Sequence, residues 1–253
     1  MSWQNACKSL RNYIVKIETP DGYGTGFFFA YNENRAMVAI ATALHVVSEA
    51  YEWRKPIRIR HGADDICLPH EDRVILIDRK RDSAAILMLA SALKAPETML
   101  GLVAVNKYMR PGTRVMWGGY PGIAEEKLCF FDGVVSAFNR GHASYYLDGV
   151  AINGVSGGPV FDDHLEGQPS DIVGIVSAYF VNRQRGETLP GFAMAHDVTH
   201  LHATIAQIKN LDDAKDKEEQ QRQASTSAQA GKDAKPGSGS DTNPSPEPKP
   251  KQG

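Results

Sequence analysis

Residues 153–159 read Asn-Gly-Val-Ser-Gly-Gly-Pro and are the most informative segment of the chain. Glycine tolerates the positive φ angles that other residues avoid, so this segment can form a tight turn before the apolar run that follows it. Such a turn can aim the backbone N–H groups of Gly154 and Ser156 at one point, where they would form an oxyanion hole. A serine hydroxyl alone is a weak nucleophile, so Ser156 needs a neighbouring base.

The base is expected among the eight histidines of the chain. His45 follows the apolar run 36–42 and begins a short helical turn in the segment Thr-Ala-Leu-His-Val-Val. The other seven histidines lie in polar loops or in the final helix, where solvated histidines are ordinary; they are at positions 61, 70, 142, 164, 196, 200 and 202. We therefore predict that His45 is the base for Ser156.

An acidic residue is expected beside the histidine, at the end of a strand. Asp82 lies two residues before the start of the strongly apolar run 84–89. A carboxylate there can accept a hydrogen bond from the histidine ring, select its tautomer and stabilise its charged form. Asp78 is the alternative, but the basic residues 79–81 that follow it make it better suited to a surface ion pair.

The order His, Asp, Ser along the chain resembles that of chymotrypsin-like serine proteases, and the local motifs are most similar to the bacterial HtrA/Deg group. The similarity extends over about residues 12–208. Besides the histidine, aspartate and serine segments, the similar motifs are Gly24-Thr25-Gly26-Phe27, Gly118-Gly119-Tyr120-Pro121-Gly122, Gly133-Val134-Val135-Ser136, Gly174-Ile175-Val176-Ser177 and Gly191-Phe192-Ala193. The resemblance implies a serine endopeptidase that forms an acyl-enzyme with His45, Asp82 and Ser156 as its triad, without metal or cofactor.

The resemblance also implies where a substrate would bind. The segment formed by Ser177, Ala178 and Tyr179 would be an edge whose backbone pairs with an extended peptide. Residues near Val150, Ala151, Tyr179 and Gly191 would line the primary specificity pocket. None of these is charged, so a small or medium apolar side chain is the expected preference.

The first 210 residues alternate short apolar runs with turn residues, which predicts an all-β fold. The candidate strands are 13–18, 25–30, 36–42, 56–60, 73–78 and 84–89, followed by 114–118, 127–138, 143–147, 159–161, 172–180 and 191–195. This division predicts two six-stranded antiparallel barrels, at about 13–95 and 111–195, which the resemblance also implies. A short helix at 2–12 and a closing helix at 197–208 are predicted as well, the latter from apolar spacing at Val198, Leu201, Ile205 and Ile208.

The composition changes after residue 210. Residues 211–253 hold one leucine and otherwise no large apolar residue, and the last part is rich in proline. Such a segment cannot bury enough apolar surface to offset the entropy lost on ordering. We therefore predict a protease domain at 1–210 and a disordered tail at 211–253, with a short helical extension toward Gln223 as an alternative. HtrA proteins usually carry a PDZ domain after the protease, and this tail does not resemble one.

The overall composition excludes several classes of function. The 28 basic and 30 acidic residues give a net charge of −2, which does not favour binding to nucleic acid or to a membrane surface. There is no apolar stretch of about 18 residues, no secretory signal pattern, and an odd number of cysteines, so a cytoplasmic protein is expected. The expected partner is a protein or peptide substrate. The alternatives are a catalytically silent protease fold that binds extended peptides, and an esterase that uses the same residues.

Overall fold

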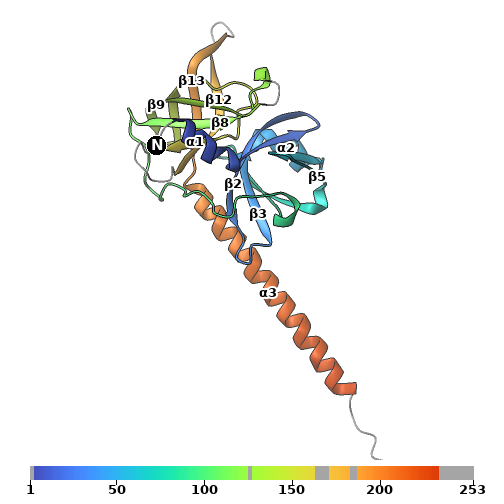
Figure 1. Ribbon diagram of the computed structural model, residues 1–253. Coiled ribbons are helices and arrows are strands. Elements are labelled where there is room, and N and C mark those ends of the chain that lie inside the picture. Colours follow the sequence, from blue (N-terminus) through green and yellow to red (C-terminus); the bar gives the residue numbers. More distant parts are fainter. Residues whose placement is uncertain (1–2, 125–126, 163–170, 183–186, 234–253) are drawn as a thin grey trace, which may run out of the picture. The chain divides into compact units, whose positions relative to one another are not determined.

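The computed structural model describes residues 3–124, 127–162, 171–182 and 187–233, and about half of residues 3–197 are in β-strands (Figure 1). The chain divides into one unit at 1–210 and a second at 211–253. Within the first unit, an open sheet is built from the N-terminal half of the strands and a closed barrel from the rest. The all-β prediction is thus confirmed for this unit.

The open sheet is antiparallel and has seven strands in the order β5-β4-β1-β2-β3-β7-β6. Its strands are β1 (Ile14–Thr19), β2 (Gly22–Tyr31), β3 (Met37–Ala43), β4 (Ile57–His61), β5 (Asp64–Leu68), β6 (Arg73–Asp78) and β7 (Ser83–Leu89). The sequence predicts a closed six-stranded barrel at about 13–95. The structure has an open sheet there instead, with β5 as a seventh strand. The missed strand has a short apolar run of only three residues, 66–68, preceded by two aspartates. Ion pairs from Arg58 and Arg60 to Asp65 connect this strand to β4.

The closed barrel has six strands in the order β10-β13-β12-β11-β8-β9. Its strands are β8 (Arg114–Gly119), β9 (Cys129–Asn139), β10 (Ser144–Asp148), β11 (Pro159–Asp162), β12 (Ile172–Asn182) and β13 (Glu187–Asp197). The register of β11 with β12 ends at the pair Pro159–Ile175, so β12 continues beyond β11. The loop from Asn153 to Gly158 lies directly before β11.

Two hydrophobic clusters form the core. One is confined to the open sheet and the helix packed on it, and includes Val15, Ile40 and Ile86. The other contains Phe27 and Ala41 of the open sheet together with Trp117 and Phe161 of the barrel, all of them buried. Because this second cluster includes side chains from both halves, the barrel and the sheet pack against each other through a continuous apolar core, which gives the residues at their junction fixed positions.

Three α-helices and four short 3₁₀ helices complete the described part of the chain: α1 (Trp3–Leu10), α2 (Leu44–Glu52), α3 (His200–Asp233), η1 (Arg11–Tyr13), η2 (His70–Asp72), η3 (Ala90–Ala92) and η4 (Gly122–Ala124). Within the described residues, none of the helices combines the length and the apolar character needed to cross a membrane.

The last helix is longer than predicted. Leu201 and Ile208 are buried in the core that the two halves share, as expected for the closing helix. The helix then continues through Asp233, beyond the predicted end at residue 208 and beyond the alternative extension toward Gln223. The residues from 211 onward are rich in Ala, Glu, Lys and Gln, which favour helix even without a packed face. The rest of the predicted tail, 234–253, lies outside the described residues.

Candidate active site

His45 and Asp82 are brought together by the pairing of β3 with β7. The register pairs Ala43 with Ser83, so the residues just beyond these two strand ends lie side by side. The Leu44 N–H donates to the Asp82 carbonyl at 2.9 Å, and the His45 N–H donates to Asp82 Oδ1 at 3.0 Å. His45 Nδ1 lies 2.7 Å from Asp82 Oδ2, which leaves Nε2 directed away from the carboxylate. Asp78, the alternative acid, pairs with Arg81 instead.

The electrostatic environment keeps Asp82 ionised. Burial of this carboxyl group opposes ionisation, but the hydrogen bonds from His45 and Ser177 outweigh it and hold the pKa of Asp82 below its ordinary value. Asp82 also has a φ of 46°, a left-handed conformation that aspartate adopts more readily than most residues. An ionised carboxylate in this place can orient the His45 ring and stabilise its protonated form.

The Ser177 hydroxyl makes a contact that the sequence does not predict. Its Oγ donates to Asp82 Oδ2 at 2.6 Å, and its backbone carbonyl accepts the Ser156 hydroxyl at 3.3 Å. Ser177 therefore links the acid of the open sheet to the serine of the barrel. The sequence analysis had assigned it only to a substrate-binding edge, and no local pattern predicts a contact between residues 95 positions apart.

Ser156 is half-buried and lies where the barrel meets the open sheet. The Thr25 N–H in β2 donates to the Ser156 carbonyl at 2.8 Å. In the neighbouring Gly157, whose φ is 85°, a Cβ atom would lie 2.0 Å from the Thr25 carbonyl oxygen and 2.3 Å from Thr42 Oγ1. Only glycine fits this approach, and it packs the serine loop against the strand that leads to His45. No hydrogen bond among the described residues joins Ser156 to His45.

The predicted oxyanion donors are available. Among the hydrogen bonds of the described residues, the N–H groups of Gly154 and Ser156 donate to no protein acceptor. Gly154 has a φ of 93°, and a Cβ there would lie 2.3 Å from the Tyr120 carbonyl oxygen. Glycine is therefore required at this position for both conformation and space.

The predicted specificity residues are only partly described. Gly149 N–H donates to the Gly191 carbonyl, which brings Val150 next to Gly191, and Trp117 Nε1 donates to the Val150 carbonyl. Val150 is exposed, Ala151 is half-buried, and a Cβ on Gly191 would meet open space. Ala178 and Tyr179 pair with Met194 and Ala193 through their backbones, whereas their side chains lie outside the described residues.

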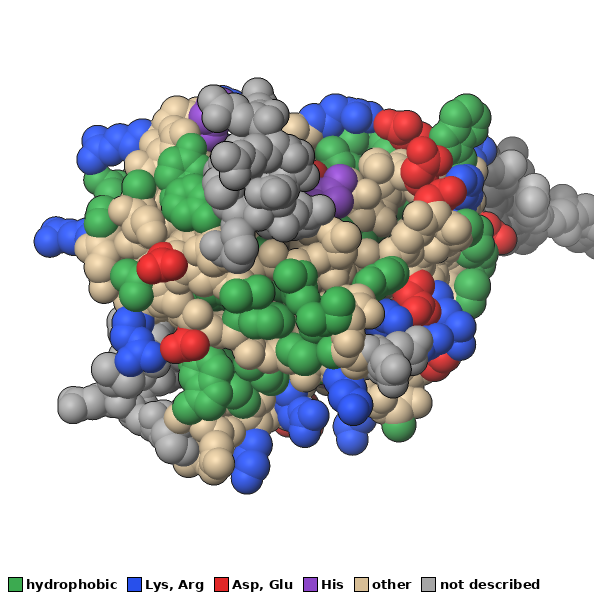
Figure 2. All heavy atoms as spheres, turned by 90° about the horizontal axis from the view of Figure 1, so that it is seen from above, with side chains coloured by type: hydrophobic (Ala, Val, Ile, Leu, Met, Phe, Trp, Pro, Cys, Tyr) green, Lys and Arg blue, Asp and Glu red, His purple; other side chains and the backbone are tan. Residues whose placement is uncertain are grey.

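Figure 2 shows one face of the molecule, on which hydrophobic side chains gather near the middle and most charged side chains lie toward the margin.

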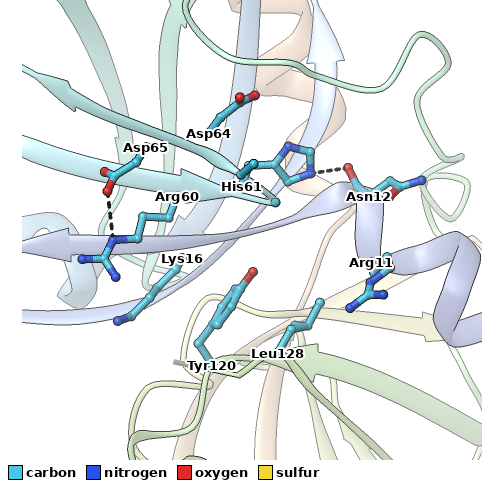
Figure 3. A pocket seen from close by; sticks show the side chains of 11 residues that line it. Arg11, Asn12, Lys16, Arg60, His61, Asp64, Asp65, Tyr120 and Leu128 are labelled. Atoms are coloured by element: carbon cyan, nitrogen blue, oxygen red, sulfur yellow. Dashed lines mark hydrogen bonds and ion pairs between the residues drawn. The ribbon is translucent and has the colours of Figure 1, made fainter. Parts of the chain in front are cut away.

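A separate cavity of about 480 Å³ is polar, and Figure 3 shows Arg11, Lys16, Arg60 and Tyr120 around it. None of the predicted site residues lines this cavity, so it is not part of the candidate active site.

Three of the remaining histidines, His61, His196 and His200, are not solvated as expected. His196 in β13 is only 7% exposed, and burial lowers its pKa. His200 Nε2 lies 2.8 Å from Ser83 Oγ and its Nδ1 lies 2.8 Å from the Asp197 carbonyl, so both ring nitrogens have partners. This Ser83–His200 pair is a part-buried contact between β7 and α3, in which Ser83 is 2% exposed.

Residues 24–175 match the family described as "Trypsin-like peptidase domain". No curated protein sequence matches the chain. The crystal structure of Deg5 is similar with a TM-score of 0.59 and 18% identity, covering 79% of this chain and 90% of that one. A serine endoprotease from Yersinia pestis has a TM-score of 0.61 and 17% identity, covering 83% and 67% of the two chains. An inactive form of the Rv3671c protease has a TM-score of 0.55 and 17% identity, covering 80% and 92%.

Proposed function

The chain belongs to the trypsin-like peptidase family and is a serine-type endopeptidase, and we propose that it cleaves peptide bonds through an acyl-enzyme formed on Ser156. The predicted chymotrypsin-like fold and the similarity to HtrA/Deg proteases are confirmed. The proposed triad is His45, Asp82 and Ser156. The observation that carries this proposal is the hydrogen bond between His45 Nδ1 and an ionised Asp82 at the junction where the Ser156 loop docks.

In the proposed mechanism, His45 Nε2 accepts the proton of the Ser156 hydroxyl as Oγ attacks the substrate carbonyl carbon. The carbonyl oxygen gains negative charge and is held by the N–H groups of Gly154 and Ser156. His45 then donates its proton to the leaving amine, which departs and leaves an ester on Ser156. Water, activated by His45 in the same way, hydrolyses this ester and restores the serine.

One rotation must precede the first step. The Ser156 hydroxyl donates to the Ser177 carbonyl, so its side chain has to turn toward His45 before the proton is transferred. Such rotamer changes are fast compared with enzymatic turnover. Hydrogen bonds between catalytic groups are often long or misaligned without substrate, so this geometry is compatible with catalysis.

The substrate is proposed to be an extended segment of a protein or peptide. Pairing of β12 with β11 ends at Ile175, which leaves the backbone from Ser177 to Tyr179 available on that side for a substrate strand. Entry of the substrate would displace the Ser156 hydroxyl from the Ser177 carbonyl. Val150, Ala151 and Gly191 are uncharged, which supports a preference for a small or medium apolar side chain.

A catalytically silent peptide-binding module is the second candidate. It is favoured by one observation, namely that the Ser156 hydroxyl is bonded to Ser177 and not to His45. The two candidates differ in the reactivity of Ser156, because only a serine activated by a base attacks an electrophilic phosphorus centre.

A fluorophosphonate probe therefore tests the proposal. The wild-type protein should be labelled, Ser156→Ala should not be labelled, and Ser136→Ala is the matched control, since Ser136 is an exposed serine on β9. Mass spectrometry of a peptide library treated with the same three proteins should show internal cleavage by the wild type and the control. Equal labelling of Ser156→Ala and wild type would remove Ser156 from the mechanism. Labelling without any peptide cleavage would favour an esterase.

A further inference from the structure

We infer that Thr25, on the open sheet, is a positioning residue for the oxyanion hole of the barrel. This inference rests on the proposed function, because it assigns a role in holding the two N–H donors of Gly154 and Ser156. Thr25 belongs to the motif Gly24-Thr25-Gly26-Phe27, to which no role in the reaction has been given above.

Four consecutive carbonyl groups of the serine loop each accept one hydrogen bond. The Asn153 carbonyl accepts from Gly122 N–H at 2.9 Å, and the Val155 carbonyl accepts from Gly158 N–H at 2.9 Å. The Gly154 carbonyl accepts from Thr25 Oγ1 at 2.7 Å, and the Ser156 carbonyl accepts from Thr25 N–H at 2.8 Å. Thr25 thus supplies two of the four anchors, and its hydroxyl is the only side chain among them.

These anchors determine where the oxyanion donors point. In a trans peptide the N–H is directed opposite to the preceding carbonyl, so holding a carbonyl also orients the N–H on the other side of the bond. The anchors on Asn153 and Val155 therefore orient the N–H groups of Gly154 and Ser156. The peptide group between these two is held at its carbonyl by the Thr25 hydroxyl, and its N–H, that of Val155, donates to the Ile152 carbonyl at 3.0 Å. The next peptide group is held at its carbonyl by the Thr25 N–H, and its N–H, that of Gly157, donates to the Val176 carbonyl at 2.7 Å. Thr25 thus contributes one side-chain bond and one backbone bond to the relative orientation of the two donors.

Thr25 is itself rigid enough to act in this way. It is fully buried. Its hydroxyl accepts from Tyr120 N–H at 3.0 Å while donating to Gly154. The single hydroxyl proton is therefore committed to the Gly154 carbonyl. A β-branched side chain in a strand also has few rotamers.

The conformation of Gly154 makes the anchor necessary. With a φ of 93° and no side chain, its backbone has more accessible conformations than that of any other residue type. Without the Thr25 hydroxyl, the buried Gly154 carbonyl and the part-buried Tyr120 N–H would lose their partners, and the peptide after Gly154 would be held only by the bond from Val155 N–H to the Ile152 carbonyl. The two donors would then no longer converge on one point.

The test compares Thr25→Val, which keeps the shape but removes the hydroxyl, with Thr25→Ser, which keeps it. Thr42→Val is the matched control, because it also removes a buried hydroxyl from this pair of strands but leaves the four anchors in place.

Each variant is assayed for peptide cleavage and for inhibition by a peptide aldehyde and by the corresponding peptide alcohol. The Ser156 hydroxyl adds across the aldehyde C=O to form a hemiacetal whose oxygen occupies the oxyanion hole. The alcohol cannot react and reports only ground-state binding.

We expect Thr25→Val to lower kcat about 10- to 100-fold and to weaken aldehyde inhibition by a similar factor, with KM and alcohol inhibition within about twofold of wild type. Thr25→Ser should restore both values, and Thr42→Val should lose thermal stability without this selective loss. If Thr25→Val does not fold, Thr25→Cys replaces it, since a thiol is a much weaker donor than a hydroxyl, and the same selective loss relative to Thr25→Ser is expected.

Three results would overturn the inference: unchanged aldehyde inhibition in Thr25→Val, an equal loss of aldehyde and alcohol binding, or the same selective loss in Thr42→Val. Failure of the proposed function would look different. In that case the wild-type protein itself would neither cleave peptides nor react with the fluorophosphonate probe.

Discussion

At the scale of single residues, four hydrogen bonds converge on Asp82. The His45 ring, the His45 N–H and the Ser177 hydroxyl bind its carboxylate, and the Leu44 N–H binds its carbonyl. Leu44 and His45, at the start of α2, supply three of these donors. The fourth, Ser177, comes from the barrel. Asp82 is thus the group through which the two halves of the site orient each other.

Asp82→Asn should reduce kcat about 10⁴-fold, because an amide in this place favours the wrong histidine tautomer. Asp78→Asn is the matched control: Asp78 pairs with Arg81 and does not touch His45, so its variant should cleave peptides at nearly the wild-type rate. Steady-state kinetics on one peptide checks both. A dead Asp78→Asn beside an active Asp82→Asn would move the acid to Asp78.

Ser177→Ala should keep the substrate-binding backbone but lose one donor to Asp82. A hydrogen bond to a charged group contributes about 1.5–3 kcal/mol, so its loss should raise the pKa of Asp82 and lower kcat roughly tenfold. Steady-state kinetics on one peptide checks this, and an unchanged kcat would mean that the Ser177 hydroxyl does not act on the acid.

At the scale of elements, α3 combines two different parts in one helix. Up to residue 210 it carries buried apolar side chains, with Leu201 1% and Ile208 3% exposed. Leu211, the first residue of the second unit, is 49% exposed, and the described residues after it are exposed or half-buried. The stability of the protease domain should therefore depend on the first three turns of the helix and not on the remainder.

Leu201→Ala should lower the free energy of unfolding by about 2–5 kcal/mol, because it removes a buried side chain and leaves a cavity. Leu211→Ala, the same change at an exposed position, should alter the free energy of unfolding by no more than about 0.5 kcal/mol.

We also propose that a chain ending at residue 211 keeps its melting temperature and its peptide cleavage. Urea unfolding and kinetics on the same peptide check all three. A several-fold gain in activity on truncation would show that the removed segment inhibits the site.

At the scale of the whole molecule, three histidines make the free energy of unfolding depend on pH. His61 in the open sheet, His196 in the barrel and His200 in α3 all have their pKa lowered, in each case mainly by burial. A lowered histidine pKa means that the folded protein binds fewer protons than the unfolded chain once the pH falls below about 6.5. Acidification through this range should therefore destabilise the protein. The aspartates with lowered pKa, including Asp82, act in the same direction but only at lower pH.

The free energy of unfolding should thus fall between pH 7.5 and 5.5, as measured by urea denaturation at a series of pH values. His200→Gln should reduce this dependence, because an amide does not titrate and can still bond to Ser83. His70→Gln, at an exposed position, should leave it unchanged. A stability that is constant over this range would mean that the buried histidines are protonated in the folded protein as readily as in the unfolded chain.

Short-range patterns were sufficient to predict the all-β fold, the family and most of the strands, because apolar periodicity and glycine-rich turns are local properties of the chain. They also singled out His45, Asp82 and Ser156, whose assignment as a triad stays a prediction. The extra strand β5, the open sheet, the buried histidines, the Ser177 hydroxyl and the two anchors from Thr25 depend on tertiary packing. Thr25 Oγ1 and the Gly154 carbonyl are 129 positions apart, as Ser177 and Asp82 are 95 apart. Such contacts exist only because the shared core brings two sheets together, and no pattern within either segment encodes the partner it will meet.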